Sequence, residues 1–303
     1  MIYTVTVNPC IDRLYYFDEI KRNDVNRPKK TGVISGGKGI NVSKALNVLG
    51  EENKAIIISG GRSGIMLEEL LKEEGINFCS VKCNGETRTN LMIRGTKNEE
   101  EIRINEYGPI INSEVERELI KKLDIIKEND IVVLSGSLPE GVKEDFYKKI
   151  GDIIVNNKKA RVVIDSDLEE MKFALECKLF MIKPNKEELM RLTGKSGSIE
   201  DLIELCDKKE IKYGFLTDGK KGGYLYFNKK VYKMIPPEVT AITTVGAGDS
   251  FIGGFLSCIN AGKDIKDAVK MALALSAAKV EGKFIKDRVN ELFEKALIEE
   301  IVI

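Results

Sequence analysis

The stretch Thr244-Val245-Gly246-Ala247-Gly248-Asp249-Ser250-Phe251 places an acidic side chain where two glycines open a helix. Apolar residues follow at the spacing of one helical face, and Gly262 stands where such a helix would end. Gly246 and Gly248 permit a sharp turn, so that unpaired N–H groups at the helix start can face an anion. The helix dipole adds to the attraction for negative charge at that point.

The position of Asp249 favours catalysis over passive anion binding. A carboxylate would repel a resting anion, whereas a base that takes a hydroxyl proton while a phosphoryl group arrives is needed there. The alternative is a helix whose Asp249 only caps its N-terminus.

The composition excludes several classes of protein. The chain has 303 residues, of which 43% are hydrophobic, and can bury a large core. Its 48 basic and 48 acidic residues cancel, which argues against a nucleic-acid partner or an anionic membrane surface. The sequence shows no apolar run of membrane-spanning length and no signal-peptide pattern, so we expect a cytoplasmic protein.

The chain contains no histidine, which excludes His-based triads, His metal ligands and imidazole bases. Its six cysteines are scattered, and no second pair completes a metal site beside Cys79 and Cys83. Reduced thiols are therefore expected. Acid–base chemistry must come from carboxylates, Lys, Tyr or Cys.

Strand-like and helix-like segments alternate along the chain, which predicts an α/β fold with a mostly parallel sheet covered on both faces. We expect a single domain over residues 1–303, with lid segments at about 12–34 and 86–107. One helix is predicted to start with a capping box of Ser113 and Glu116. The predicted strands are Ile2–Val7, Ala55–Ser59, Ile131–Leu134, Val162–Asp165, Leu179–Ile182 and Gly214–Thr217.

The second lid segment reads as a β-hairpin. Thr87–Arg94 and Glu101–Glu106 flank the polar turn Lys97–Glu100, and alternation puts Arg88 and Asn90 on one face with aliphatic residues on the other. A small β-layer suits a lid that excludes water. An ordinary solvated sheet face is the alternative.

Polar clusters follow five of the predicted strands, at the edge where open α/β sheets bind ligands. The clusters are Asn8–Asp12, Ser135–Ser137, Asp165, Lys183–Asn185 and Thr217–Gly219. Their coincidence at one edge predicts a binding site there.

Two further stretches carry polar groups at predicted helix starts. The turn Gly36–Asn41 allows close approach of a ligand, and Asn41 can hydrogen-bond sugar hydroxyls. The turn matches neither the dinucleotide fingerprint nor the Walker pattern. The run Asn185–Glu188 suits either magnesium-bound water near phosphates or a helix start with acidic first-turn residues.

Together these motifs resemble the ribokinase-like (pfkB) carbohydrate kinases, and specifically their phosphosugar branch. Within it the residues look most similar to 1-phosphofructokinases, with tagatose-6-phosphate kinases next. The matching motifs run in order along nearly the whole chain: Asn8–Asp12, Gly36–Val42, Gly85–Arg88, Ser135–Pro139, Lys183–Asn185 with Glu188, and Thr244–Ser250.

The resemblance implies a Rossmann-like body with a β-lid that forms a homodimer clasp, ATP as donor and Mg2+ as cofactor. It assigns Asp249 as the base that accepts the proton of the acceptor hydroxyl. The N–H groups of Gly246, Ala247 and Gly248 would stabilise the transferring phosphoryl group.

The resemblance also implies the remaining site residues. Lys38 and Arg88, with Arg27, would hold the phosphate of a phosphoketose substrate, because a dianion needs cationic donors. Asn185 and Glu188 would hold magnesium through water. The substrate-binding set is Asp12, Arg27, Gly36, Gly37, Lys38, Asn41, Arg88, Asn90 and Ser137. The nucleotide-binding set is Lys183, Asn185, Glu188, Thr217, Gly219 and Gly222.

The implied reaction is phosphorylation of the 6-hydroxyl of fructose 1-phosphate, with tagatose 6-phosphate as the alternative substrate. Lys220-Lys221 precede Gly222 where relatives usually place an acidic residue, and Val280–Phe284 lacks the usual Gly/Thr-rich loop near the purine. Both departures concern residues that are expected to contact the nucleotide. A non-catalytic sugar-phosphate sensor is disfavoured, because a sensor has no use for Asp249.

Overall fold

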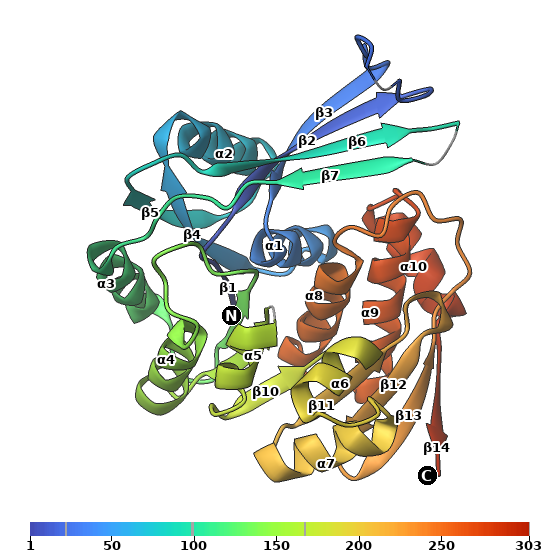
Figure 1. Ribbon diagram of the computed structural model, residues 1–303. Coiled ribbons are helices and arrows are strands. Elements are labelled where there is room, and N and C mark those ends of the chain that lie inside the picture. The colour runs from blue at the N-terminus through green and yellow to red at the C-terminus, as the bar shows by residue number, and fades with distance from the viewer. Residues whose placement is uncertain (22, 98–99, 167, 303) are drawn as a thin grey trace.

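A single large sheet forms the centre of the molecule (Figure 1). The computed structural model describes residues 1–21, 23–97, 100–166 and 168–302, and within them the sheet has ten strands. In sheet order these are β14 (Leu297–Ile301), β13 (Lys230–Ile235), β12 (Gly223–Phe227), β11 (Tyr213–Thr217), β10 (Leu179–Ile182), β9 (Arg161–Asp165), β8 (Ile131–Ser135), β1 (Ile2–Thr6), β4 (Asn53–Gly60) and β5 (Phe78–Cys83).

In this sheet order, the strands from β11 through β8 and β1 to β5 run parallel, and β12, β13 and β14 add an antiparallel end. All six predicted strands are present, with ends shifted by no more than two residues. Their apolar runs are continuous because both faces of the sheet are buried. In β8, Val132 and Leu134 pack on one face while Ile131 and Val133 pack on the other.

Helices cover both faces, as the sequence predicts (Figure 1). On one face lie α1 (Lys38–Leu49), α2 (Gly61–Glu73), α8 (Ala247–Asn260) and α9 (Ile265–Val280), with α10 (Lys286–Lys295) packed against α9. On the other lie α3 (Ser113–Lys122), α4 (Phe146–Asp152), α5 (Leu168–Ala174), α6 (Lys186–Thr193) and α7 (Ile199–Lys209).

A second, four-stranded sheet projects beyond α1 (Figure 1). Its order is β3 (Lys30–Gly36), β2 (Cys10–Phe17), β6 (Arg88–Gly95) and β7 (Glu101–Asn105). The predicted hairpin is confirmed, since β6 and β7 pair antiparallel, although residues 98–99 of its turn lie outside the described residues. The register puts Asn90 opposite Asn105 and Leu91 opposite Ile104, so polar and aliphatic side chains occupy opposite faces.

Two helix ends test the capping predictions. The capping box of Ser113 and Glu116 is wrong, because the N-cap of α3 is Asn112, whose side chain accepts hydrogen bonds from the N–H groups of Glu114 and Val115. Asn112 stands one residue earlier and reaches both amides, which leaves Ser113 as the first helical residue. Gly262 is confirmed as a turn residue after α8, with a φ of 71°.

Among the described residues, no helix combines the length and apolar character that a bilayer span requires.

Candidate active site

The helices α1 and α8 bring two N-termini to one place. A Cβ on Gly253 of α8 would lie 2.6 Å from the Cβ of Ala45 in α1, so the two backbones approach closely. Four residues earlier in each helix, the Nδ2 of Asn41 donates to the Oδ2 of Asp249 at 2.8 Å. Since both contacts advance by four residues, the helices run parallel, and their positive ends point the same way.

Asp249 lies in the first turn of α8 and does not cap it. The N-cap is Gly246, in the left-handed region with a φ of 76°, and no side chain caps this helix. The capping interpretation of Asp249 is therefore wrong. The side chain is buried, and its Oδ1 accepts no hydrogen bond from another described residue, so one carboxylate oxygen stays open to a ligand.

Burial raises the pKa of Asp249 to about 6, and the negative charge of Asp165 adds to the effect. The hydrogen bond from Asn41 and the positive charges of Lys38 and Lys183 act in the opposite direction. The group is thus ionised near neutral pH, while its proton affinity exceeds that of an ordinary Asp. That combination suits a general base.

Of the three N–H groups predicted to form an anion hole, those of Gly246, Ala247 and Gly248, that of Ala247 already donates to a backbone carbonyl. Ser250 holds the carbonyl of Gly246 through its N–H at 2.9 Å and its hydroxyl at 2.8 Å. The N–H of Ala247 donates to the carbonyl of Thr244 at 3.3 Å. The N–H groups of Gly246 and Gly248 donate to no backbone carbonyl among the described residues, so they are open to an anion.

Lys183 lies beside this turn, at the end of β10. A Cβ on Gly248 would lie 3.2 Å from its ammonium nitrogen, so the glycine leaves room for the lysine. The motif thus uses its two glycines differently: Gly246 for a left-handed turn and Gly248 for space.

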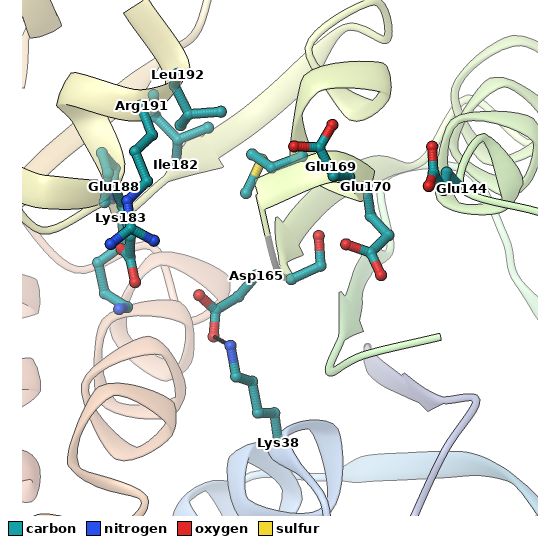
Figure 2. Close-up of a pocket in the computed structure, with 13 residues that line it drawn as sticks. Lys38, Glu144, Asp165, Glu169, Glu170, Ile182, Lys183, Glu188, Arg191 and Leu192 are labelled. Atoms are coloured by element: carbon teal, nitrogen blue, oxygen red, sulfur yellow. Dashed lines mark ion pairs between the residues drawn. The ribbon is translucent and has the colours of Figure 1, made fainter. Parts of the chain in front are cut away.

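A cavity of about 510 Å³ opens from Lys183 across the carboxyl ends of β9 and β10 (Figure 2). Its charged lining carries both signs, and the ammonium of Lys38 lies 3.6 Å from the Oδ2 of Asp165. The lining residues are Lys38, Glu144, Asp165, Ser166, Glu169, Glu170, Met171, Ile182, Lys183, Pro184, Glu188, Arg191 and Leu192.

Asn185 and Glu188 form a capping box at the start of α6. The side chain of Asn185 accepts from the N–H of Glu188, and Oε2 of Glu188 accepts from the N–H of Asn185, both at 2.9 Å. The helix-start interpretation of these residues is confirmed. Oε1 of Glu188 remains available in the cavity wall.

The remaining residues predicted to bind the nucleotide, Thr217, Gly219 and Gly222, lie at the end of β11 and in the turn that follows it. The hydroxyl of Thr217 donates to the carbonyl of Pro184 at 3.4 Å, which ties this loop to the start of α6. Gly219 opens a short 3₁₀ turn to Lys221. The fold itself requires a glycine at position 222, because a Cβ there would lie 2.0 Å from the carbonyl oxygen of Met234.

On the lid side, a polar cluster gathers around Asp12. Its Oδ1 accepts from the Nδ2 of Asn90 at 3.0 Å and from the thiol of Cys10 at 3.2 Å. Its Oδ2 faces Gly36, where a Cβ would lie only 2.4 Å away. Burial raises the pKa of the Cys10 thiol, so the thiol stays protonated and donates.

Arg88 is positioned by backbone carbonyls. Its Nη2 donates to the carbonyl of Asn8 at 2.9 Å and its Nη1 to that of Glu106 at 3.3 Å. Its Nε is buried and has no hydrogen-bond partner among the described residues, and the same holds for Oδ1 of Asn8 and Oδ1 of Asn90. Unpartnered buried polar atoms in one cluster indicate a site that a polar ligand completes.

The other predicted substrate residues divide into two groups. Gly37 is the N-cap of α1, and Ser137 follows β8 at the sheet edge, so both lie at the ends of elements that meet here. Lys38 lines the same cavity as Lys183, and its ammonium lies 3.6 Å from the Oδ2 of Asp165. Arg27 lies on the exposed connection between β2 and β3, apart from these groups.

Four acidic residues of the cavity wall were not among the predicted site residues: Glu144, Asp165, Glu169 and Glu170. Asp165 stands at a strand end, a signal that was visible in the sequence but was not enough to assign a role. Glu169 and Glu170 lie on α5, a seven-residue helix whose place in the cavity wall follows from packing alone.

Comparisons with known proteins agree with this geometry. The pfkB family of carbohydrate kinases matches residues 5–284. The chain is 32% identical to 1-phosphofructokinase of Bacillus subtilis, over 99% of this chain and 98% of that protein. It is 31% identical to tagatose-6-phosphate kinase of Staphylococcus epidermidis, over 99% of this chain and 100% of that protein.

A solved structure shows the same fold. Phosphofructokinase-2 from Escherichia coli in complex with fructose-6-phosphate superimposes with a TM-score of 0.90 at 26% identity, over 97% of this chain and 98% of that one. A tetrameric inhibited form of the same Escherichia coli protein has also been solved. The chain therefore belongs to the pfkB family of carbohydrate kinases and is an ATP-dependent sugar kinase.

Proposed function

We propose that this kinase transfers the γ-phosphoryl group of ATP to the 6-hydroxyl of fructose 1-phosphate, giving fructose 1,6-bisphosphate and ADP. The observation that carries the proposal is the open carboxylate of Asp249 beside the free amides of Gly246 and Gly248. Asp249 accepts the hydroxyl proton as the oxygen bonds to the γ-phosphorus, while the bond from that phosphorus to the bridging oxygen of ADP breaks.

The amides at the start of α8 stabilise the charge that the phosphoryl group carries during transfer. They act with the helix dipole and with Lys183, whose ammonium lies beside Gly248. Asn41 orients the carboxylate of Asp249, because its hydrogen bond occupies one oxygen and leaves the other for the substrate.

The lid-side cluster supports a substrate that already carries a phosphate. Arg88 has a buried, unpartnered Nε, and its guanidinium offers the planar donors that phosphate oxygens match. Asp12 and Asn90 lie next to it and suit sugar hydroxyls, because they offer acceptors and donors together. Lys38 is better assigned to the ATP phosphates, since it lines the same cavity as Lys183.

The cavity between β9, β10 and α6 suits ATP with Mg2+. The described residues contain no cluster of three metal-ligating side chains, but Mg2+ keeps several waters and binds through one or two carboxylates and the substrate phosphates. The open Oε1 of Glu188 fits that role, with Asn185 holding Glu188 in place. When bound, the ion neutralises charge on the phosphates.

The choice of sugar rests on the relatives and on the charge of the site. A neutral sugar would leave the guanidinium of Arg88, whose Nε is buried, without an anion, which disfavours unphosphorylated substrates. Tagatose 6-phosphate is the second candidate, since the tagatose-6-phosphate kinase of Staphylococcus epidermidis matches over the full length of both chains.

Coupled ADP release should be measured with fructose 1-phosphate, tagatose 1-phosphate, fructose 6-phosphate and tagatose 6-phosphate. We expect the highest kcat/KM with fructose 1-phosphate, and a fall in affinity on Arg88→Ala that appears in KM. A higher kcat/KM for tagatose 6-phosphate would replace the proposed substrate with the second candidate.

We also propose that the lid sheet forms a homodimer interface. The register pairs Leu91 with Ile104 and Ile93 with Ile102, so these aliphatic side chains share one face of the sheet. Ile104 is 49% exposed and Ile102 is 38% exposed, which is costly for a sheet face without a partner. Mass photometry should show a dimer that Ile102→Lys with Ile104→Lys dissociates, whereas Ile65→Lys on α2 should not.

A further inference from the structure

Lys279, in the last turn of α9, brings an amine to the start of α8 that the proposed chemistry does not use. Its Cε lies 3.1 Å from the point that a Cβ on Gly246 would occupy. The Nδ2 of Asn41 lies 3.5 Å from the same point. The ammonium is one bond beyond Cε, so it lies against the turn whose amides face the phosphoryl group.

This amine makes no hydrogen bond or ion pair with another described residue, although most of the side chain is shielded from water. Its Nζ lies 5.0 Å from the centroid of the Phe284 ring, which also packs against α9. A cation in such a place is unfavourable unless negative charge compensates it. An aromatic face supplies only part of that compensation.

Four charged groups face Lys279 from the neighbouring elements: Lys44 of α1, Asp249 of α8, Glu74 at the end of α2, and Asp12 of β2. Lys44 and Glu74 form an ion pair with each other at 3.0 Å, so they largely cancel. The charge that remains is negative and comes from Asp249 and Asp12, both residues of the candidate active site. Burial and the nearby positive charge of Lys44 lower the pKa of Lys279.

We propose that Lys279 is a fixed cation behind the anion hole, where it stabilises the negative charge that the phosphoryl group brings to the start of α8. The inference rests on the proposed function, in which those amides receive the phosphoryl group. In the free enzyme, little negative charge compensates the ammonium of Lys279. The phosphoryl group supplies negative charge during transfer, so the stabilising effect of Lys279 is largest in the transition state. Lys279 is therefore a positioning residue that acts across Gly246 rather than by contact with the sugar.

The test compares Lys279→Met, Lys279→Arg and a matched control, Lys270→Met. Lys270 lies on the same helix with its Nζ 4.4 Å from the centroid of the Phe293 ring, but away from the start of α8. We expect Lys279→Met to lower kcat by about tenfold with little change in either KM. Lys279→Arg should retain most of the activity and Lys270→Met all of it.

The pH profile separates charge from packing. In the wild type, kcat should fall at alkaline pH, below the ordinary range of lysine, as Lys279 loses its proton. Lys279→Arg should move that fall to higher pH, since guanidinium stays protonated. An unchanged kcat in Lys279→Met, or a folded Lys279→Arg as impaired as Lys279→Met with the alkaline fall unmoved, would overturn the proposal.

A binding measurement needs no turnover. ADP with aluminium fluoride mimics the transferring group, and its gain in affinity over ADP alone should shrink severalfold in Lys279→Met but not in Lys270→Met. If the gain in affinity were as large in Lys279→Met as in Lys270→Met, the result would contradict the role of Lys279. If instead the gain shrinks as expected while no phosphoketose is phosphorylated, the role of Lys279 stands and the proposed substrate class fails.

Discussion

Two helix starts lie close to Lys183 and are built in opposite ways. α6 begins with a closed capping box, in which Asn185 and Glu188 satisfy each other's N–H groups. α8 begins at Gly246 with no side-chain cap, and amides of its first turn stay open. A helix start without a cap gives up about 1 kcal/mol of stability, and here that loss leaves an anion site beside a buried base.

Removing the base should produce the largest effect. Asp249→Asn keeps the shape and still accepts the hydrogen bond from Asn41, but it cannot take a proton. We expect kcat to fall by at least about 10²-fold with little change in the KM for the sugar phosphate. Steady-state kinetics with both substrates measures this. Turnover within tenfold of the wild type would remove Asp249 from the role of base.

The acidity of Asp249 should set the acid limb of the rate profile. Because its pKa is raised to about 6, kcat/KM should fall roughly tenfold for each pH unit below 6. The positive charge of Lys38 lowers this pKa, so Lys38→Met should move the limb to higher pH. A limb near pH 4 in the wild type would show that the pKa of Asp249 is not raised in the free enzyme.

The same carboxylate should make the open helix start unfavourable for stability at neutral pH. Its folded pKa of about 6 lies above the ordinary 3.8, so its ionisation destabilises the fold as pH rises through 6. Asp249→Asn should therefore raise the free energy of unfolding at pH 8, by at most about 3 kcal/mol. The gain should shrink as pH falls from 6 to 4. Urea titrations of both proteins at pH 8 and pH 4 test this. A stability gain that is larger at pH 4 than at pH 8 would contradict the prediction.

The two helix starts also show which features a sequence pattern can predict and which it cannot. The glycines and Asp249 identify the open start, and the acidic first turn identifies the capped one, because both signals are local. The bond between Asn41 and Asp249 spans 208 residues and depends on the packing of Gly253 against Ala45. No local pattern contains such a contact.

Other parts of the fold escaped prediction for related reasons. The strand β5 and the antiparallel strands β12 to β14 lie at or near the two ends of the sheet and are only partly buried, so they lack the continuous apolar runs that identify the central strands. The parallel pairing of β2 with β6 joins segments about 80 residues apart. Lys279 ends an alanine-rich helix and carries no motif, so its place beside Gly246 became visible only from the packing of α9.

The smallest effects should come from the capped start, where two substitutions separate capping from charge. Asn185→Ala removes the cap and should cost about 1 kcal/mol of stability. Glu188→Gln keeps an acceptor for the N–H of Asn185 but removes the charge, so it should raise the KM for MgATP a few-fold with stability nearly unchanged. Denaturant melts and ATP titrations of both variants check this. If Glu188→Gln left the KM for MgATP unchanged, Glu188 would only cap α6. The start of α6 would then serve stability alone, and the start of α8 would serve ligand binding alone.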